Sequence, residues 1–239
     1  MIEIKVNSTI KIDGKRVKGS LLITPHKTQE IKDLEIDYPK FLKVERRTDR
    51  MWNEFLDIEM KDKVEAEITI SYSLYRRPIG DISGEDFLSE SRYIKFKDIP
   101  NLEGEKLTKV KNALMIIKEK MKYDKEKAKV KSASSSLRLG YGVCVNFSHA
   151  FIAMMRKNGI PARIVVGIPP GIYDAAHAWV QVKLDKHWID VDPTAGIVTR
   201  FLPYAPWGIG EDESEVKSKI IGINPHIFEK HITEITNRS

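Results

Sequence analysis

Three residues of this sequence have the side-chain types of a thiol-based acyl-transfer site. They are Cys144, His177 and Asp192, in that order along the chain. A thiolate can attack an acyl carbon, and a histidine can take or share its proton near neutral pH. A carboxylate on the far ring nitrogen fixes the imidazole tautomer and steadies the imidazolium. The three residues form such a site only if the fold brings them together.

The residues after Cys144 predict a helix that begins at or just after the cysteine. Apolar side chains recur there at helical spacing, at Phe147, Ala150, Phe151, Met154 and Met155. Gly159, one residue before Ile160-Pro161, ends this helix. The positive end of the helix favours thiolate over thiol, and the N–H of Cys144 is a candidate oxyanion donor. The second donor is not assigned. The alternative is an inert, buried cysteine that plugs the helix start.

Two alternating segments, His177–Leu184 and His187–Asp192, predict a β-hairpin around the turn Asp185-Lys186. If Leu184 faces His187, one face of the hairpin is wholly apolar. A slip of one residue would mix polar and apolar side chains on both faces. This register is therefore strongly preferred.

The opposite face of the predicted hairpin carries the polar candidates. Asp192 becomes the diagonal neighbour of His177, and such neighbours are ~7 Å apart. Asp190 pairs further from His177 and is the weaker candidate. Trp179 and Trp188 share this face, and we expect them to cover the site and exclude water. The alternatives are a surface His–Asp pair on a half-exposed sheet, and two tryptophans that are plain core.

The composition narrows the possible partners. Lys and Arg number 40 against 34 Asp and Glu, for a net charge of +6. The two signs are interspersed, as in 118–120 and 125–127, which indicates a solvated surface with a thermophile-like composition rather than a nucleic-acid site. We therefore expect a protein or peptide substrate and no nucleic acid. The oligomeric state is not predicted.

Localisation follows from what the sequence lacks. The start alternates like a strand and has no signal-peptide pattern, and no apolar run approaches the ~20 residues of a membrane helix. A single cysteine agrees with a reducing compartment. These features predict a cytoplasmic protein without a membrane partner.

No metal or cofactor is expected. The histidines at 26, 149, 187, 226 and 231 share no ligand spacing. His149 should turn away from the thiol on its helix. The acidic run Glu211-Asp212-Glu213 lacks the spacing of a calcium loop and is interpreted as solvated surface.

The order of elements predicts an α+β protein with two domains. Residues 1–95 are expected to form a β-sandwich-like domain, with a hairpin at Asp13-Gly14 and a clear strand over 64–74. Residues 96–239 are expected to form the second domain. There the stripe from Leu107 to Met121 predicts a helix, and 131–136 is interpreted as a polar loop.

Three motifs together resemble the transglutaminase-like superfamily. They are Tyr141-Gly142-Val143-Cys144-Val145-Asn146-Phe147-Ser148, His177-Ala178-Trp179-Val180 and Trp188-Ile189-Asp190-Val191-Asp192-Pro193-Thr194, with Gly159 to Gly167 as the family's segment between helix and sheet. The resemblance covers roughly residues 101 to 200. It implies a papain-like core with the nucleophile on a helix packed against an antiparallel sheet. It also implies that Cys144, His177 and Asp192 are catalytic and that Tyr141 and Gly142 line the site beside Trp179 and Trp188.

The sequence departs from the crosslinking members of this family. They typically carry a tryptophan after the cysteine, where this chain has Val145, and their calcium-binding segments have no counterpart here. The resemblance therefore implies a protease- or amidase-like hydrolase. The alternatives are a protein-glutamine transglutaminase with an amine as acyl acceptor, and a catalytically silent binding module.

Overall fold

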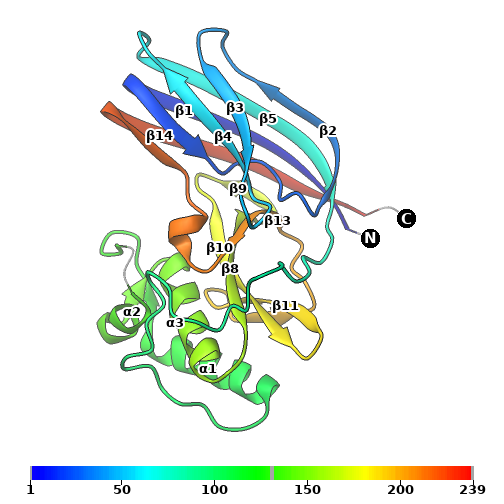
Figure 1. The fold of residues 1–239 in the computed structure, drawn as a ribbon, viewed down its shortest axis with the longest axis vertical. Helices are drawn as coiled ribbons and strands as arrows, with labels where there is room; N and C mark the ends of the chain where they lie inside the picture. Colours follow the sequence, from blue (N-terminus) through cyan, green and yellow to red (C-terminus); the bar gives the residue numbers. More distant parts are fainter. Residues whose placement is uncertain (1, 130–131, 238–239) are drawn as a thin grey trace.

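The computed structural model describes residues 2–129 and 132–237. It has an α+β architecture: an N-terminal antiparallel sheet is followed by helices packed on a second antiparallel sheet (Figure 1). This confirms the predicted fold class. Among the described residues, no helix is long and apolar enough to cross a membrane.

The N-terminal sheet has seven strands, in the order β2-β5-β1-β14-β9, and β4 joins β1 to β3. Its strands are β1 (Ile2–Leu21), β2 (Glu30–Asp37), β3 (Lys43–Thr48), β4 (Glu54–Met60), β5 (Glu65–Tyr75), β9 (Gly171–Tyr173) and β14 (Lys219–Asn237). They are hydrogen-bonded as one branched sheet, because β1 pairs with β5 over residues 3–13 and with β4 over residues 17–21. The strand predicted over 64–74 is confirmed as β5.

The predicted hairpin at Asp13-Gly14 is wrong. β1 runs through this point as a single strand and stays paired with β14 on both sides of it. The register shifts between Asp13 and Lys18, where Gly14 has a φ of 129°. A glycine with positive φ is found in β-bulges as well as in turns. Because β14 continues alongside β1 past this point, Gly14 belongs to a bulge rather than to a hairpin turn.

The predicted division into residues 1–95 and 96–239 does not follow the structure. β14, near the end of the chain, pairs with β1 from Ser20 back to Ile2 and so belongs to the N-terminal sheet. β9 extends the same sheet by pairing with β14. Figure 1 shows both termini at this sheet. The two layers therefore exchange strands and are not consecutive domains.

The second sheet has five strands, in the order β12-β11-β10-β8-β13. They are β8 (Ala162–Ile168), β10 (His177–Leu184), β11 (His187–Asp192), β12 (Ile197–Thr199) and β13 (Ala205–Gly210). The predicted hairpin register is confirmed, with Leu184 opposite His187 and Val180 opposite Val191. One face of this sheet packs against α3 (Cys144–Lys157), which buries the apolar stripe of the helix.

Two further helices lie beside α3. They are α1 (Lys106–Lys120) and α2 (Ala133–Leu139). Two short strands, β6 (Lys122–Tyr123) after α1 and β7 (Tyr141–Gly142) after α2, pair in parallel. The helix predicted from Leu107 is confirmed, although Leu107 itself is exposed. The loop predicted over 131–136 is wrong from Ala133 onward, because the Ser132 side chain accepts from Ser135 N and caps α2. Lys131 lies outside the described residues.

The second face of the β10–β11 hairpin is buried, so the half-exposed alternative is wrong. The segment after β5 covers it. Arg76 lies fully buried 2.9 Å from Asp190. Arg163 donates to the carbonyls of Ile79 and Gly80 and to Gln181 Oε1. Guanidinium groups that reach buried carboxylates and carbonyls thus replace water on this face.

Two residues of the acidic run at 211–213, Asp212 and Glu213, are also buried rather than solvated. Asp212 is 1% exposed. Its carboxylate accepts from Ser91 Oγ, Tyr93 N and Ser214 N at 2.6, 2.9 and 2.9 Å. It caps the 3-10 helix η1 (Glu213–Glu215) and ties it to the segment around residue 91. A carboxylate with this many donors can be buried at little cost.

Arg76→Met should strongly destabilise the protein. It leaves Asp190 buried without its cation, which typically costs about 3–5 kcal/mol. Arg77→Met is the matched control, because Arg77 pairs with Glu30 at the surface, where such pairs contribute about 0–1 kcal/mol. Urea unfolding of both variants measures the free energies. Equal losses in the two variants would show that the Arg76–Asp190 pair has no special structural role.

Candidate active site

Cys144 is the first residue of α3, which confirms the predicted helix start. The turn before it is fixed by Asn146, whose Oδ1 accepts from Val143 N at 3.1 Å. Asn146 Nδ2 donates to Lys129 O and to Ser136 Oγ, each at 3.1 Å. The thiol is therefore held at the positive end of a helix whose first N–H groups have no intrahelical acceptor.

His177 links the thiol to the carboxylate. Its Nε2 lies 2.8 Å from Asp192 Oδ2. The thiol of Cys144 lies close enough to the imidazole to help raise the pKa of His177. Asp192 is 1% exposed, and its Oδ1 accepts from the N–H groups of Thr194 and Ala195 at 3.0 and 3.2 Å. We name Cys144, His177 and Asp192 the candidate triad, in which a hydrogen bond joins His177 to Asp192.

Asp190, the weaker sequence candidate, has a different environment. Its Oδ1 accepts from Gln181 Nε2, and its Oδ2 accepts from Arg76 and from the N–H of Leu202. Asp190 is therefore occupied by the buried ion pair. Asp192 is the carboxylate that reaches His177.

The charge of His177 is set by opposing effects. Burial disfavours the imidazolium, but hydrogen bonds and charges from Asp192 and Cys144 outweigh it and raise the pKa of His177 from 6.5 to about 9. For Asp192, burial is outweighed by the hydrogen bond and charge of His177, and the pKa of the carboxyl is lowered. Because the folded-state pKa of His177 is raised, its protonation stabilises the fold fully below pH 6.5. That contribution is lost as the pH rises through about 9.

Tyr204 completes the site and was missed by the sequence analysis. Its ring meets those of His177 and Trp179 edge-on, with centroids 5.9 and 5.3 Å away. Its hydroxyl donates to Asp192 Oδ2 at 3.4 Å. Burial and the charge of Asp192 raise the pKa of Tyr204, so the phenol stays neutral. No motif or periodicity marked this residue, because it lies in the loop before β13.

Tyr123 was also missed. It is half-exposed in β6 and leans on Phe147 with ring centroids 6.5 Å apart. Partial burial and the charges of Cys144 and Asp174 raise its pKa. Tyr123 therefore lies near the thiol, at a solvent-accessible side of the site.

The four predicted lining residues have different places. Gly142 is buried directly before the nucleophile turn, and Tyr141 is half-buried beside it in β7. Trp179 is fully buried and packs against Tyr204, so it supports the site from behind. Trp188 does not reach the site: it pairs with Lys183 near the hairpin turn, and its Nε1 donates to Asp81 Oδ1 at 2.7 Å.

The structure places His149 away from the thiol. Its ring stacks on Tyr93 with centroids 5.3 Å apart, and its Nε2 accepts from Glu213 N at 3.2 Å. Over residues 2–129 and 132–237, no three His, Cys, Asp or Glu side chains converge as metal ligands would. The site is therefore described by its organic groups.

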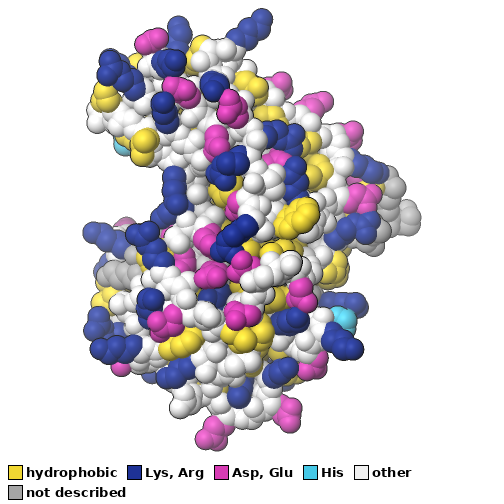
Figure 2. Space-filling model, viewed as in Figure 1, with side chains coloured by type: hydrophobic (Ala, Val, Ile, Leu, Met, Phe, Trp, Pro, Cys, Tyr) yellow, Lys and Arg dark blue, Asp and Glu magenta, His cyan; other side chains and the backbone are white. Residues whose placement is uncertain are grey.

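A cavity of about 290 Å³ opens beside the triad. His177 and Val145, the residue after the candidate nucleophile, both line it. It lies between the N-terminal sheet, which contributes Ile227, and the second sheet, which contributes Val166. On the face drawn in Figure 2, basic and acidic side chains are interspersed. We name this space the His177 cavity.

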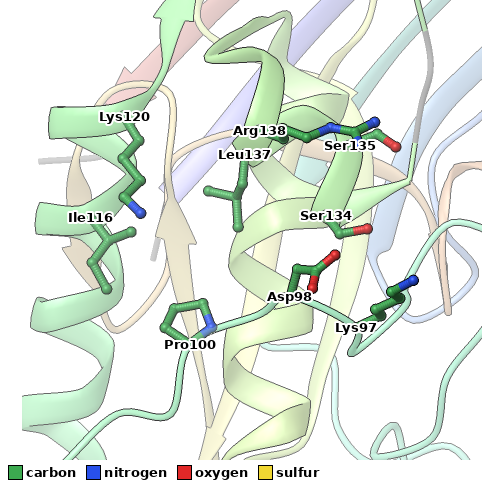
Figure 3. A pocket seen from close by; sticks show the side chains of 9 residues that line it. All are labelled: Lys97, Asp98, Pro100, Ile116, Lys120, Ser134, Ser135, Leu137 and Arg138. Carbon is green, nitrogen blue, oxygen red and sulfur yellow. The ribbon is translucent and has the colours of Figure 1, made fainter.

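A second cavity, of about 360 Å³, lies between α1, α2 and the segment around residue 98 (Figure 3). Lys97, Lys120 and Arg138 give it basic character, with Asp98 as its carboxylate. None of its lining residues belongs to the candidate triad. We therefore assign it no part in the chemistry.

Gly142→Ala should disrupt the nucleophile turn. A Cβ at Gly142 would lie 2.4 Å from Asn146 Cβ, so the first turn of α3 must shift. Overpacking of this kind costs about 1–3 kcal/mol, and we expect slower alkylation of Cys144 as well. Gly80→Ala is the control, because a Cβ there meets nothing within 4 Å. Urea unfolding and the iodoacetamide rate constant test both; an unchanged Gly142→Ala variant would contradict the role of this contact.

Comparison with known proteins finds similarity over the part of the chain that carries this site. Residues 97–193, which include the candidate triad, match the family described as the transglutaminase-like superfamily. A crystal structure of a candidate cysteine protease from Cytophaga hutchinsonii superposes with a TM-score of 0.81, covering 100% of this chain and 92% of that chain at 17% identity. Protein YebA of Bacillus subtilis, described as uncharacterized, is 35% identical over 71 residues, which are 23% of this chain and 10% of that protein. This chain thus spans about a tenth of the length of that curated relative. Residues 97–193 are thus similar to the core of the transglutaminase-like superfamily.

Proposed function

We propose that this protein is a cysteine-dependent acyl-transfer enzyme that acts on amide or peptide bonds of a protein or peptide substrate. The observation that carries the proposal is the hydrogen bond between His177 and Asp192, together with the thiol of Cys144 at the start of α3, near enough to affect the pKa of His177. The transglutaminase-like core supports it. The candidate cysteine protease that shares the fold agrees with it.

The geometry supports the following first step. The Cys144 sulfur, as thiolate, attacks the carbonyl carbon and forms a C–S bond, while negative charge develops on the carbonyl oxygen. The backbone N–H of Cys144 is one donor for that oxyanion. The imidazolium of His177 then gives its proton to the leaving amine as the C–N bond breaks. The products of this step are a free amine and a thioester on Cys144.

The second step releases the acyl group. His177, now neutral, takes a proton from water as its oxygen attacks the thioester carbon, and the C–S bond breaks to give a carboxylic acid and the thiolate. Asp192 holds the imidazole through Nε2 in both steps and stabilises its charged form. An amine in place of water would give a new amide. We propose water as the main acceptor, in keeping with the cysteine protease of the shared fold.

Alkylation of Cys144 should report an activated thiolate. The chain has one cysteine, so intact-mass measurement assigns every adduct. We expect iodoacetamide to react rapidly well below pH ~8.5, where ordinary thiols become slow, with a change near pH 9 as His177 loses its proton.

The variants His177→Ala and Asp192→Asn distinguish the contributions of the imidazole and of the carboxylate to the alkylation rate of Cys144. In His177→Ala the rate should follow ordinary thiol behaviour across the pH range. In Asp192→Asn the change assigned to His177 should move to lower pH, because the imidazolium loses its counter-charge. His187→Ala is the matched control, since that histidine is exposed at the far end of the hairpin. A slow reaction identical in wild type and His177→Ala would leave the silent binding module as the remaining interpretation.

A thioester on Cys144 is the second expected observation. Incubation with activated peptide esters should add one acyl mass, removable by hydroxylamine, and Cys144→Ser should show no such adduct. Decay of the adduct in buffer alone indicates hydrolysis. Acceleration by added primary amine, with formation of the amide, would favour the transglutaminase alternative. A thiol that alkylates rapidly but never acquires an acyl group would contradict acyl transfer.

A further inference from the structure

The His177 cavity lies where part of an acyl donor must be. Its lining includes the imidazole of His177 and the side chain of Val145, next to Cys144. A carbonyl carbon close enough for the sulfur to attack has its own substituents within a few ångströms of both residues. The cavity is therefore placed to contact the substrate group attached to the reacting carbonyl.

Two layers of the molecule build its walls. The second sheet contributes Val166 and Trp207, and the N-terminal sheet contributes Ile227 on β14, with Leu22 just after β1. Val216 closes the space from the segment after η1. The N-terminal sheet thus forms one side of a cavity whose other side is next to the candidate triad.

The inner surface is apolar in character. The Trp207 Nε1 donates to Tyr72 Oη at 2.8 Å, so this polar atom is already satisfied. Lys217 lies 3.3 Å from Glu213, and Glu229 lies 3.2 Å from His231, so the charged lining groups have partners of their own. The space left between these pairs is bounded mainly by aliphatic and indole carbon. It suits an apolar group better than a charged one.

We propose that this cavity is a specificity pocket that receives a leucine- or phenylalanine-sized side chain of the substrate residue supplying the scissile carbonyl. The inference rests on the proposed function and adds the substrate class. At about 290 Å³ the cavity has room for one large side chain and not for a folded segment. Burying such a side chain accounts for about a 10- to 100-fold preference over glycine.

Peptidyl chloromethyl ketones test this directly, because they alkylate the thiol and carry a chosen side chain beside the carbonyl. The measured quantity is the second-order rate constant for acetyl-Leu, acetyl-Phe, acetyl-Gly and acetyl-Asp chloromethyl ketones, each divided by the iodoacetamide rate constant of the same variant. We expect the Leu and Phe reagents to exceed the Gly reagent about 10- to 100-fold. The Asp reagent should gain nothing over Gly.

Two substitutions of Ile227 should change this preference in opposite directions. Ile227→Trp fills the cavity from the N-terminal sheet and should bring the Leu-to-Gly ratio close to one. Ile227→Ala enlarges it and should shift the preference from Leu toward Phe. Phe228→Trp is the matched control, because Phe228 is the next residue of β14, is 57% exposed and does not line the cavity. It should keep the wild-type ratios.

The outcomes distinguish the two proposals. Rapid, His177-dependent iodoacetamide alkylation without a Leu-over-Gly preference, or with a preference that both Ile227 variants retain, would overturn the specificity pocket and leave the proposed function standing. Slow, His177-independent alkylation would overturn the proposed function and the pocket with it. Circular dichroism of each variant checks that β14 still folds. The opposite directions expected for Trp and Ala keep the result from resting on one variant.

Discussion

The buried ion pair between Arg76 and Asp190 is the constraint on which the arrangement of the site depends. Asp190 and Asp192 point to the same face of β11, because side chains two apart in a strand share a face. That face is buried, and a carboxylate there needs a cation or several donors. Arg76 supplies the cation for Asp190 from the residue directly after β5. The N-terminal sheet is thereby anchored to the hairpin that carries the candidate triad.

Burial of this face disfavours the charged form of His177. A comparison with His26, a second buried histidine, shows the direction of this effect on a histidine pKa. His26 is also buried, but it bonds only to Thr28 and to the Met51 carbonyl, and burial lowers its pKa to about 4. Burial also disfavours the charged form of His177, yet the carboxylate of Asp192 and the thiol of Cys144 raise its pKa to about 9. Burial alone would therefore give a neutral imidazole. The two partners make an imidazolium that can protonate a leaving group.

Local sequence patterns were sufficient to predict the parts of the site that lie on elements with a regular apolar spacing, namely the β10–β11 hairpin and α3. The apolar alternation fixed the hairpin register, and the register placed Asp192 rather than Asp190 beside His177. The helical stripe placed Cys144 at a helix start. The same register also excludes Trp188 from the site. Its partner Lys183 lies six residues from His177, or about 20 Å at 3.3 Å per residue.

What escaped prediction depends on contacts between distant segments. β14 completes a sheet begun by the first residues of the chain, and no periodicity can indicate which strand another will join. Tyr204 reaches His177 from a loop, and Asp212 is buried because donors at Ser91 and Tyr93 come to it from far along the sequence. The run containing Asp212 was interpreted as solvated surface because it lacks the spacing of a calcium loop, and nothing near it in the sequence indicates these donors.

Because β14 belongs to the N-terminal sheet, the residues that activate the candidate nucleophile and some of the residues that line the His177 cavity lie on different parts of the fold. The thiolate and imidazolium depend on α3 and on the β10–β11 hairpin, whereas one wall of the His177 cavity belongs to β14. Inner-face residues of β14 such as Ile227 can therefore vary without changing the groups that bond to His177. Conversely, the long pairing of β14 with β1 gives that wall a rigid backbone, because register along the strand is specified by many pairs at once. A fold that exchanges strands between its layers can thus alter the wall of the proposed specificity pocket while keeping the same candidate nucleophile.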